Sequence, residues 1–129
     1  MFKTKSIMIN DVSYSEINFE FNTKIQAPNG ELLKPYLIGA LALNSYRLMV
    51  DIPQTPVAVG SLVLLDDNHI NIQYPENHGS ALRLTGIDNL FHHKPENQQY
   101  KNVGTALMEY VLYERLKRYN GRITLDAIM

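Results

Sequence analysis

The spacing of hydrophobic positions changes along this 129-residue chain. In residues 15–22, Ile17, Phe19 and Phe21 alternate with polar residues, which predicts a half-buried β-strand. In residues 103–119, apolar side chains recur at every third or fourth position, which predicts an amphipathic helix. Its expected apolar face consists of Val103, Leu107, Met108, Val111, Leu112, Leu116 and Tyr119. Such a face must pack on a sheet, so we expect an α+β fold.

Apolar runs between these two segments predict further strands. Residues 36–50 can form either a pair of buried strands or a helix, and we favour strands. Residues 57–74 predict an antiparallel hairpin with a turn at 66–68. Residues 81–91 predict another strand, in which Gly86 indicates a bulge or a close approach of two backbones.

The end of the sequence, residues 122–129, predicts one more strand after the helix. A strand, a loop, a helix and a strand in this order form a βαβ unit, whose two strands run parallel. Both faces of residues 122–129 carry apolar side chains, so we expect an interior strand with a neighbour on each side. We expect either a second chain, which would make a homodimer or larger assembly, or the N-terminal strand at residues 17–21 to provide the missing neighbour.

Composition limits the partners that the chain can have. The 12 Lys and Arg residues against 13 Asp and Glu residues give a net charge of -1, so we expect no nucleic-acid partner. The longest apolar run, residues 37–43, cannot span a bilayer, so we expect no membrane partner and a cytoplasmic location. The absence of cysteine excludes disulfides and thiolate chemistry. The length fits one domain, residues 1–129.

The start of the predicted helix has the chemistry of an anion site. Asn102 is a favourable N-cap, after which the N–H groups of residues 103–105 have no partner within the helix. Gly104 has no side chain to hold an anion away from the backbone, and Asn102 tolerates a left-handed conformation. Lys94 and Lys101 add positive charge. The alternative is an ordinary helix start with a glycine placed for close packing.

This segment also resembles a known family. The sequence QYKNVGTALMEY, residues 99–110, resembles motif A of the GCN5-related N-acetyltransferase (GNAT) superfamily, Gln/Arg-x-x-Gly-x-Gly/Ala followed by a leucine-rich helix. Gln99 stands at the first position of the motif, Gly104 at its second glycine, and Asn102 replaces its first glycine. The resemblance covers residues 57–129. It implies a GNAT-like, mostly antiparallel mixed sheet that ends in the βαβ unit.

The resemblance implies that acetyl-CoA is the acyl-donor co-substrate and that the acceptor is a small-molecule or protein amine. It places Phe91, His92 and His93 beside the pantetheine arm. It places the pyrophosphate beside Gln99, Tyr100, Lys101, Asn102, Val103, Gly104 and Thr105. Asp88 is the carboxylate nearest this region and the candidate catalytic base, although a solvated aspartate at a strand end is the simpler interpretation.

Three functions remain open on the sequence alone. The first is N-acetyl transfer, with weak turnover, because the family's later strands and the tyrosine that protonates the thiolate have no counterpart in this sequence. The second is a non-catalytic acyl-CoA-binding or regulatory module. The third is an interaction protein that uses an exposed sheet edge. We expect no metal site, because His92 and His93 would point to opposite faces of a strand.

Overall fold

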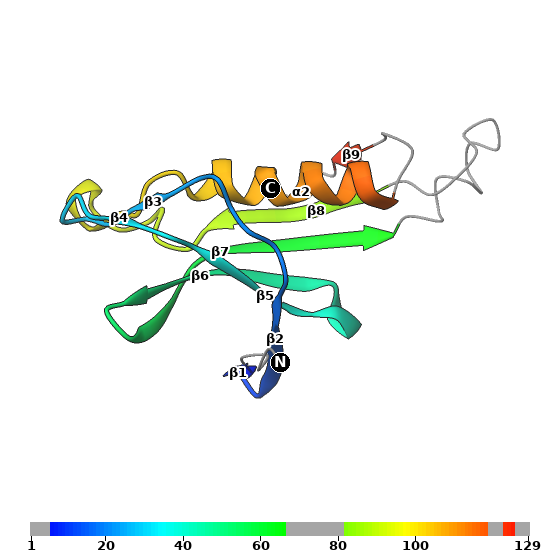
Figure 1. The fold of residues 1–129 in the computed structure, drawn as a ribbon, viewed down its shortest axis with the longest axis horizontal. Helices are drawn as coiled ribbons and strands as arrows, with labels where there is room; N and C mark the ends of the chain where they lie inside the picture. The colour runs from blue at the N-terminus through cyan, green and yellow to red at the C-terminus, as the bar shows by residue number, and fades with distance from the viewer. Residues whose placement is uncertain (1–5, 67–81, 119–122, 126–129) are drawn as a thin grey trace.

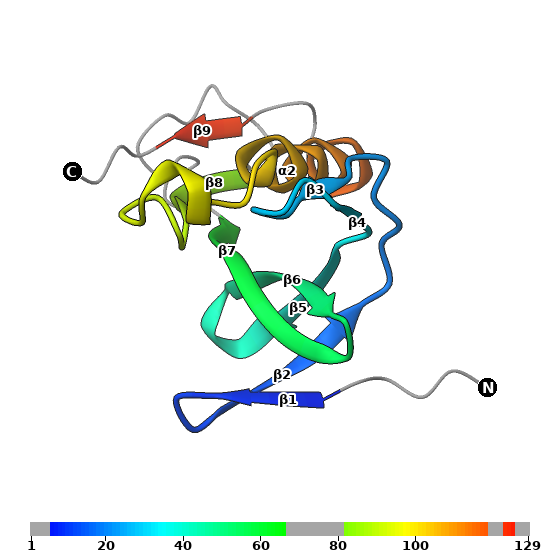
Figure 2. The same cartoon turned by 90° about the vertical axis from the view of Figure 1, so that its left-hand side faces the viewer.

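A curled, mostly antiparallel sheet of seven strands carries one long helix on one of its faces (Figures 1 and 2). The computed structural model describes residues 6–66, 82–118 and 123–125. In sheet order the strands are β1 (Ser6–Ile9), β2 (Val12–Ile17), β5 (Tyr36–Ala40), β6 (Ser45–Ile52), β7 (Thr55–Asp66), β8 (Leu82–Asn89) and β9 (Ile123–Leu125). The other elements are a ribbon of β3 (Ile25–Gln26) and β4 (Leu32–Leu33), the 3-10 turns η1 (Leu41–Leu43) and η2 (Glu96–Gln98), and α2 (Val103–Arg118).

The helix α2 confirms the predicted helix, but the buried face differs from the expected one. Its buried side chains are Val103, Ala106, Leu107, Tyr110, Val111 and Glu114. Leu112 is 44% exposed, so its assignment to the apolar face was wrong. The side chains of Leu116 and Tyr119 lie outside the described part of the chain. No helix in the described residues is long and apolar enough to cross a membrane.

Close contact between α2 and β7 depends on a glycine. A Cβ atom added at Gly60 would lie 2.8 Å from Cγ1 of Val103 and 3.1 Å from Cδ1 of Leu107. Both side chains are fully buried in the main core, with Leu48 and Leu62 from the sheet. Because Gly60 has no side chain, the first two turns of the helix can rest directly on the strand.

The N-terminal strand is shorter than predicted and lies at the far end of the sheet. β2 ends at Ile17, and beyond it Phe19 and Phe21 pack edge to face with their ring centroids 4.7 Å apart. The alternation in residues 15–22 therefore continues past the strand, because both rings join the core beneath α2. β2 pairs with β1 and β5, so the expectation that this strand fills a place beside β9 was wrong.

The predicted strand pair in residues 36–50 is confirmed by β5 and β6, which pair antiparallel. β7 confirms the first half of the hairpin predicted for 57–74, but its turn and second half lie outside the described residues. β8 confirms the strand predicted at 81–91. Its pairing with β7 skips Thr85, next to Gly86, so the bulge is confirmed. The nearest atom to an added Cβ at Gly86 is 3.6 Å away, which is an ordinary contact.

The βαβ unit is confirmed, because β8 and β9 are parallel. Their pairing runs from Leu82↔Ile123 to Leu84↔Leu125. Within the described residues, the following part of β8, residues 86–89, pairs with β7 alone. A second chain beside β9 stays a prediction.

Replacing Gly60 with alanine should destabilise the protein, because the new methyl group would press on Val103 and Leu107. We expect Gly60→Ala to lower the free energy of unfolding by about 1–3 kcal/mol, as overpacking does in other cores. Urea denaturation measures this change. Gly104→Ala is the matched control, because no atom lies within 4 Å of its added Cβ. It should be neutral or stabilise by up to about 1 kcal/mol. Equal stability of Gly60→Ala and the unchanged protein would contradict this account of the packing.

Candidate functional site

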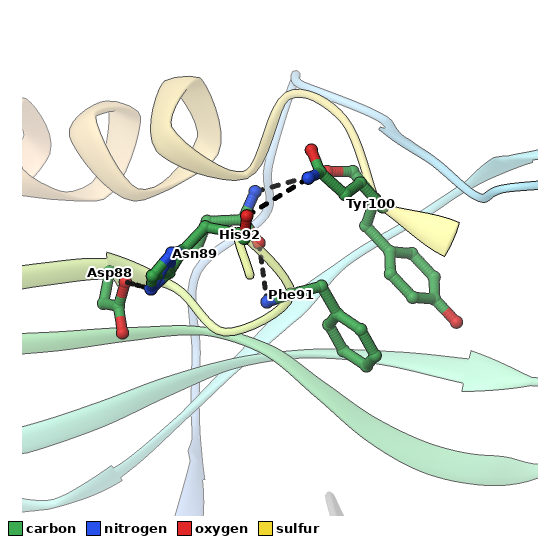
Figure 3. Close-up of polar contacts among 6 residues, drawn as sticks. Asp88, Asn89, Phe91, His92 and Tyr100 are labelled. Carbon is green, nitrogen blue, oxygen red and sulfur yellow. Dashed lines mark hydrogen bonds and ion pairs between the residues drawn. The ribbon is translucent and has the colours of Figure 1, made fainter. Parts of the chain in front are cut away.

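The loop between β8 and α2 is held closed by the side chain of Asn89, the last residue of β8 (Figure 3). Its Oδ1 accepts a hydrogen bond from the N–H of Phe91 at 3.0 Å. Its Nδ2 donates to the carbonyl oxygen of Tyr100 at 3.3 Å. One side chain therefore binds both ends of the loop and sets where the chain enters the helix.

Gln99 holds the interior of the same loop. Its side-chain Nε2 donates to the carbonyl oxygens of His92, at 3.2 Å, and Lys94, at 2.7 Å. Both N–H groups of this amide are therefore used within the loop. Gln99 was expected to contact a pyrophosphate. In the structure its side-chain amide holds the backbone of the loop through these two hydrogen bonds.

Phe91 and Tyr100 form the base of the loop. Their ring centroids are 4.8 Å apart, and both half-buried rings pack against the main core. His92 and His93 are exposed and lie in a turn beyond the end of β8, with ring centroids 5.6 Å apart. The expectation that they alternate along a strand was wrong, because the strand ends at Asn89. Within the described residues no three metal-binding side chains converge.

The N-terminal part of the chain fixes the residues just before α2. The backbones of Gln26 and Lys101 exchange two hydrogen bonds, of 3.1 and 2.9 Å. The side-chain Nδ2 of Asn102 donates to the carbonyl oxygen of Lys24 at 3.2 Å. Sequence reasoning missed this contribution from residues 24–26, because backbone pairing between distant segments leaves no local pattern.

The first turn of α2 presents unpaired N–H groups beside open space. Asn102 has a φ of 72° and so adopts the left-handed conformation that asparagine tolerates. Its carbonyl accepts the N–H of Ala106 at 3.0 Å, and its side chain binds Lys24 instead of capping the helix. No oxygen of the described residues outside the helix accepts a hydrogen bond from the N–H groups of 103–105. Gly104 is exposed, with nothing within 4 Å of an added Cβ.

A groove of about 590 Å³ runs from this turn along the helix, between residues 22–23 and the side chains of Met108 and Leu112. Glu109 lies on its wall. The two carboxylate oxygens of Glu109 accept hydrogen bonds from the backbone N–H groups of Asn22, at 2.7 Å, and Thr23, at 3.0 Å.

The charge of Glu109 limits where an anion can bind in the groove. Burial raises the pKa of Glu109, but the hydrogen bonds from Asn22 and Thr23 outweigh it, so its pKa lies below the ordinary value of 4.5. The carboxylate is therefore charged at neutral pH. An incoming anion is favoured only at the end of the groove formed by Gly104 and Thr105, where the helix N–H groups are free.

Asp88 lies near the end of β8, one residue before Asn89. Its side chain is 48% exposed, and its Oδ1 lies 3.6 Å from Nε2 of His92 (Figure 3). The structure thus brings Asp88 beside one of the histidines predicted for the cofactor region. Its role as a catalytic base stays a prediction.

Comparison of this chain with protein-family models, with curated proteins and with solved structures finds no match.

Stability at acid pH should depend on Glu109. Because its pKa is lowered in the folded protein, its carboxylate stabilises the fold above the ordinary pKa of 4.5, and this contribution is lost as the pH falls through the folded-state value. We expect Glu109→Gln to be less stable than the unchanged protein at pH 7, with a difference that shrinks below about pH 4. Urea denaturation at pH 7 and below about pH 4 measures this difference in stability. The exposed Glu96 provides the control variant Glu96→Gln, and a Glu109 effect independent of pH would refute the assignment.

Proposed function

We propose that this protein binds acetyl-CoA and transfers its acetyl group to an amine. The observation that carries the proposal is the N-terminus of α2, where left-handed Asn102 precedes free N–H groups at exposed Gly104. A pyrophosphate is the kind of anion that such a helix start binds, through backbone N–H groups and the positive end of the helix dipole. Exposed Lys94 and Lys101 lie in the loop that leads to this turn and add positive charge.

The strand before the loop supports the same proposal. Residues 86–89 of β8 pair with β7 on one edge, and no described residue pairs with the other edge. The pantetheine arm of CoA contains two amide groups, which can bind a free strand edge as an added strand does. An arm placed there would run from the helix N-terminus along β8.

The bulge in β8 offers a group for the reaction itself. The register of β7 and β8 skips Thr85, and a bulged residue is left out of the ladder. Its backbone N–H can donate to the thioester oxygen and stabilise the negative charge that develops there. The bulge lies at the end of the edge along which we place the arm.

In the proposed reaction the nitrogen of a neutral amine attacks the thioester carbon. A C–N bond forms, the C–S bond breaks, and the thiolate leaves and takes a proton from water. Asp88 lies three residues from Thr85 along β8, roughly 10 Å, so it accepts the proton that the amine loses through water. Proximity of the two bound substrates supplies the main acceleration. The order β8, α2, β9 agrees with that expected from the resemblance to GNAT proteins.

CoA should stabilise the folded protein against heat, because a ligand that binds only the folded state adds stability. At 100 times the dissociation constant the gain is about 2.7 kcal/mol. We expect Gly104→Val to lose most of this gain while keeping its own stability, since the branched side chain blocks approach to the backbone and valine suits a helix better than glycine. Melting curves with and without CoA measure both effects.

Met8→Val is the control, because this exposed position lies in β1, at the far end of the sheet. It should respond to CoA as the unchanged protein does, and adenosine should have much less effect on either. An unchanged melting temperature at millimolar CoA would refute the proposal. Equal stabilisation of Gly104→Val would place the binding site elsewhere.

A further inference from the structure

Arg47, Ser61 and Asp88 lie side by side on three neighbouring strands. The register pairs Arg47 of β6 with Ser61 of β7, and Ser61 with Asp88 of β8. Directly paired residues share one face of a sheet. The next residues, Leu48 and Leu62, are fully buried in the core that includes α2, so the three polar residues lie on the opposite face.

The guanidinium of Arg47 has N–H donors that no described residue uses. Its Nη1 donates to Oγ of Ser45, at 3.1 Å, and to the carbonyl oxygen of Tyr46, at 3.2 Å. Its Cζ lies 5.6 Å from the centre of the Tyr14 ring. Among the described residues no carboxylate pairs with Arg47, and no acceptor binds its Nε or Nη2.

The surroundings of Arg47 strengthen its attraction for an anion. Ile38, its partner on β5, and Met49, two residues along β6, are both buried on this face. Arg47 itself is half-buried. A charge is screened less beside such apolar side chains than in open water. An anion with two oxygens that can accept hydrogen bonds from the guanidinium side by side would therefore stabilise this half-buried cation.

We propose that the acceptor amine also carries a carboxylate, and that Arg47 binds this carboxylate while the amino group lies between Asp88 and the bulge in β8. The inference rests on the proposed acetyl transfer. Strands about 4.8 Å apart place the Cα atoms of Arg47 and Asp88 roughly 10 Å apart, a span suited to a small zwitterion. The hydroxyl of Ser61, between them, can bind either group. A carboxylate carries one negative charge and matches the single arginine, whereas a phosphate monoester would leave a charge uncompensated.

Phenylalanine and phenethylamine test the proposal, because they differ only in the carboxylate. NMR titration into the full chain saturated with CoA gives both dissociation constants. We expect the unchanged protein to bind phenylalanine about tenfold more tightly. Arg47→Gln should bring the two constants to within about twofold, since it removes the charged donor. Arg47→Lys keeps the charge but lacks the planar fork, so it should retain only part of the preference for phenylalanine. This variant provides the test if Arg47→Gln does not fold.

Lys34→Gln is the control, because it removes an exposed cation that pairs with Glu20. It should keep the preference for phenylalanine. All variants should keep the thermal stabilisation by CoA. If CoA binds but the unchanged protein does not prefer phenylalanine, or if Arg47→Gln keeps the preference, the carboxylate proposal is overturned and CoA binding stands. If CoA does not stabilise the unchanged protein, the proposed function fails, and this inference fails with it.

Discussion

The packing of α2 directly on β7 at Gly60 is the contact on which the candidate site depends. Val103 and Leu107 occupy the space that a side chain at residue 60 would need. This contact fixes the first two turns of the helix at the end of the sheet where β8 turns into its loop. The free N–H groups of the helix therefore lie next to the strand edge that we assign to the pantetheine arm. A helix held further from the sheet would separate these two features.

Polar contacts with the N-terminal segment complete the arrangement. Gln26 pairs with Lys101, Lys24 accepts from Asn102, and Glu109 accepts from residues 22–23. Each contact joins a backbone group of the N-terminal segment to a residue at or near the helix start. Together with the hydrogen bonds of Asn89 within the loop, they define the loop from both sides. The backbone at the candidate site is thus held in place by hydrogen bonds within the protein, and such preorganisation lowers the entropy cost of binding.

The sequence predicted local features well and long-range ones poorly. The helix follows from periodicity, which acts within a few residues, and the parallel βαβ unit follows from the order of its elements along the chain. Residue type allowed the positive φ of Asn102 without predicting it. Leu112 was assigned to the core because its spacing fits a wide apolar stripe, whereas the buried stripe passes through Tyr110 and Glu114. The place of β2 in the sheet, and the row of Arg47, Ser61 and Asp88, depend on strand order and register. Neither has a local signal in the sequence.

The central claim is that an anionic cofactor binds the backbone at the start of α2. The most direct measurement is a titration of isotope-labelled protein with CoA, followed through the backbone amide signals. The account predicts that the amide signals of Gly104 and Thr105 shift most, with smaller shifts along residues 86–89. It also predicts that amides of β1 and β2 stay unchanged. Binding that shifts signals elsewhere and leaves Gly104 and Thr105 unmoved would contradict the account.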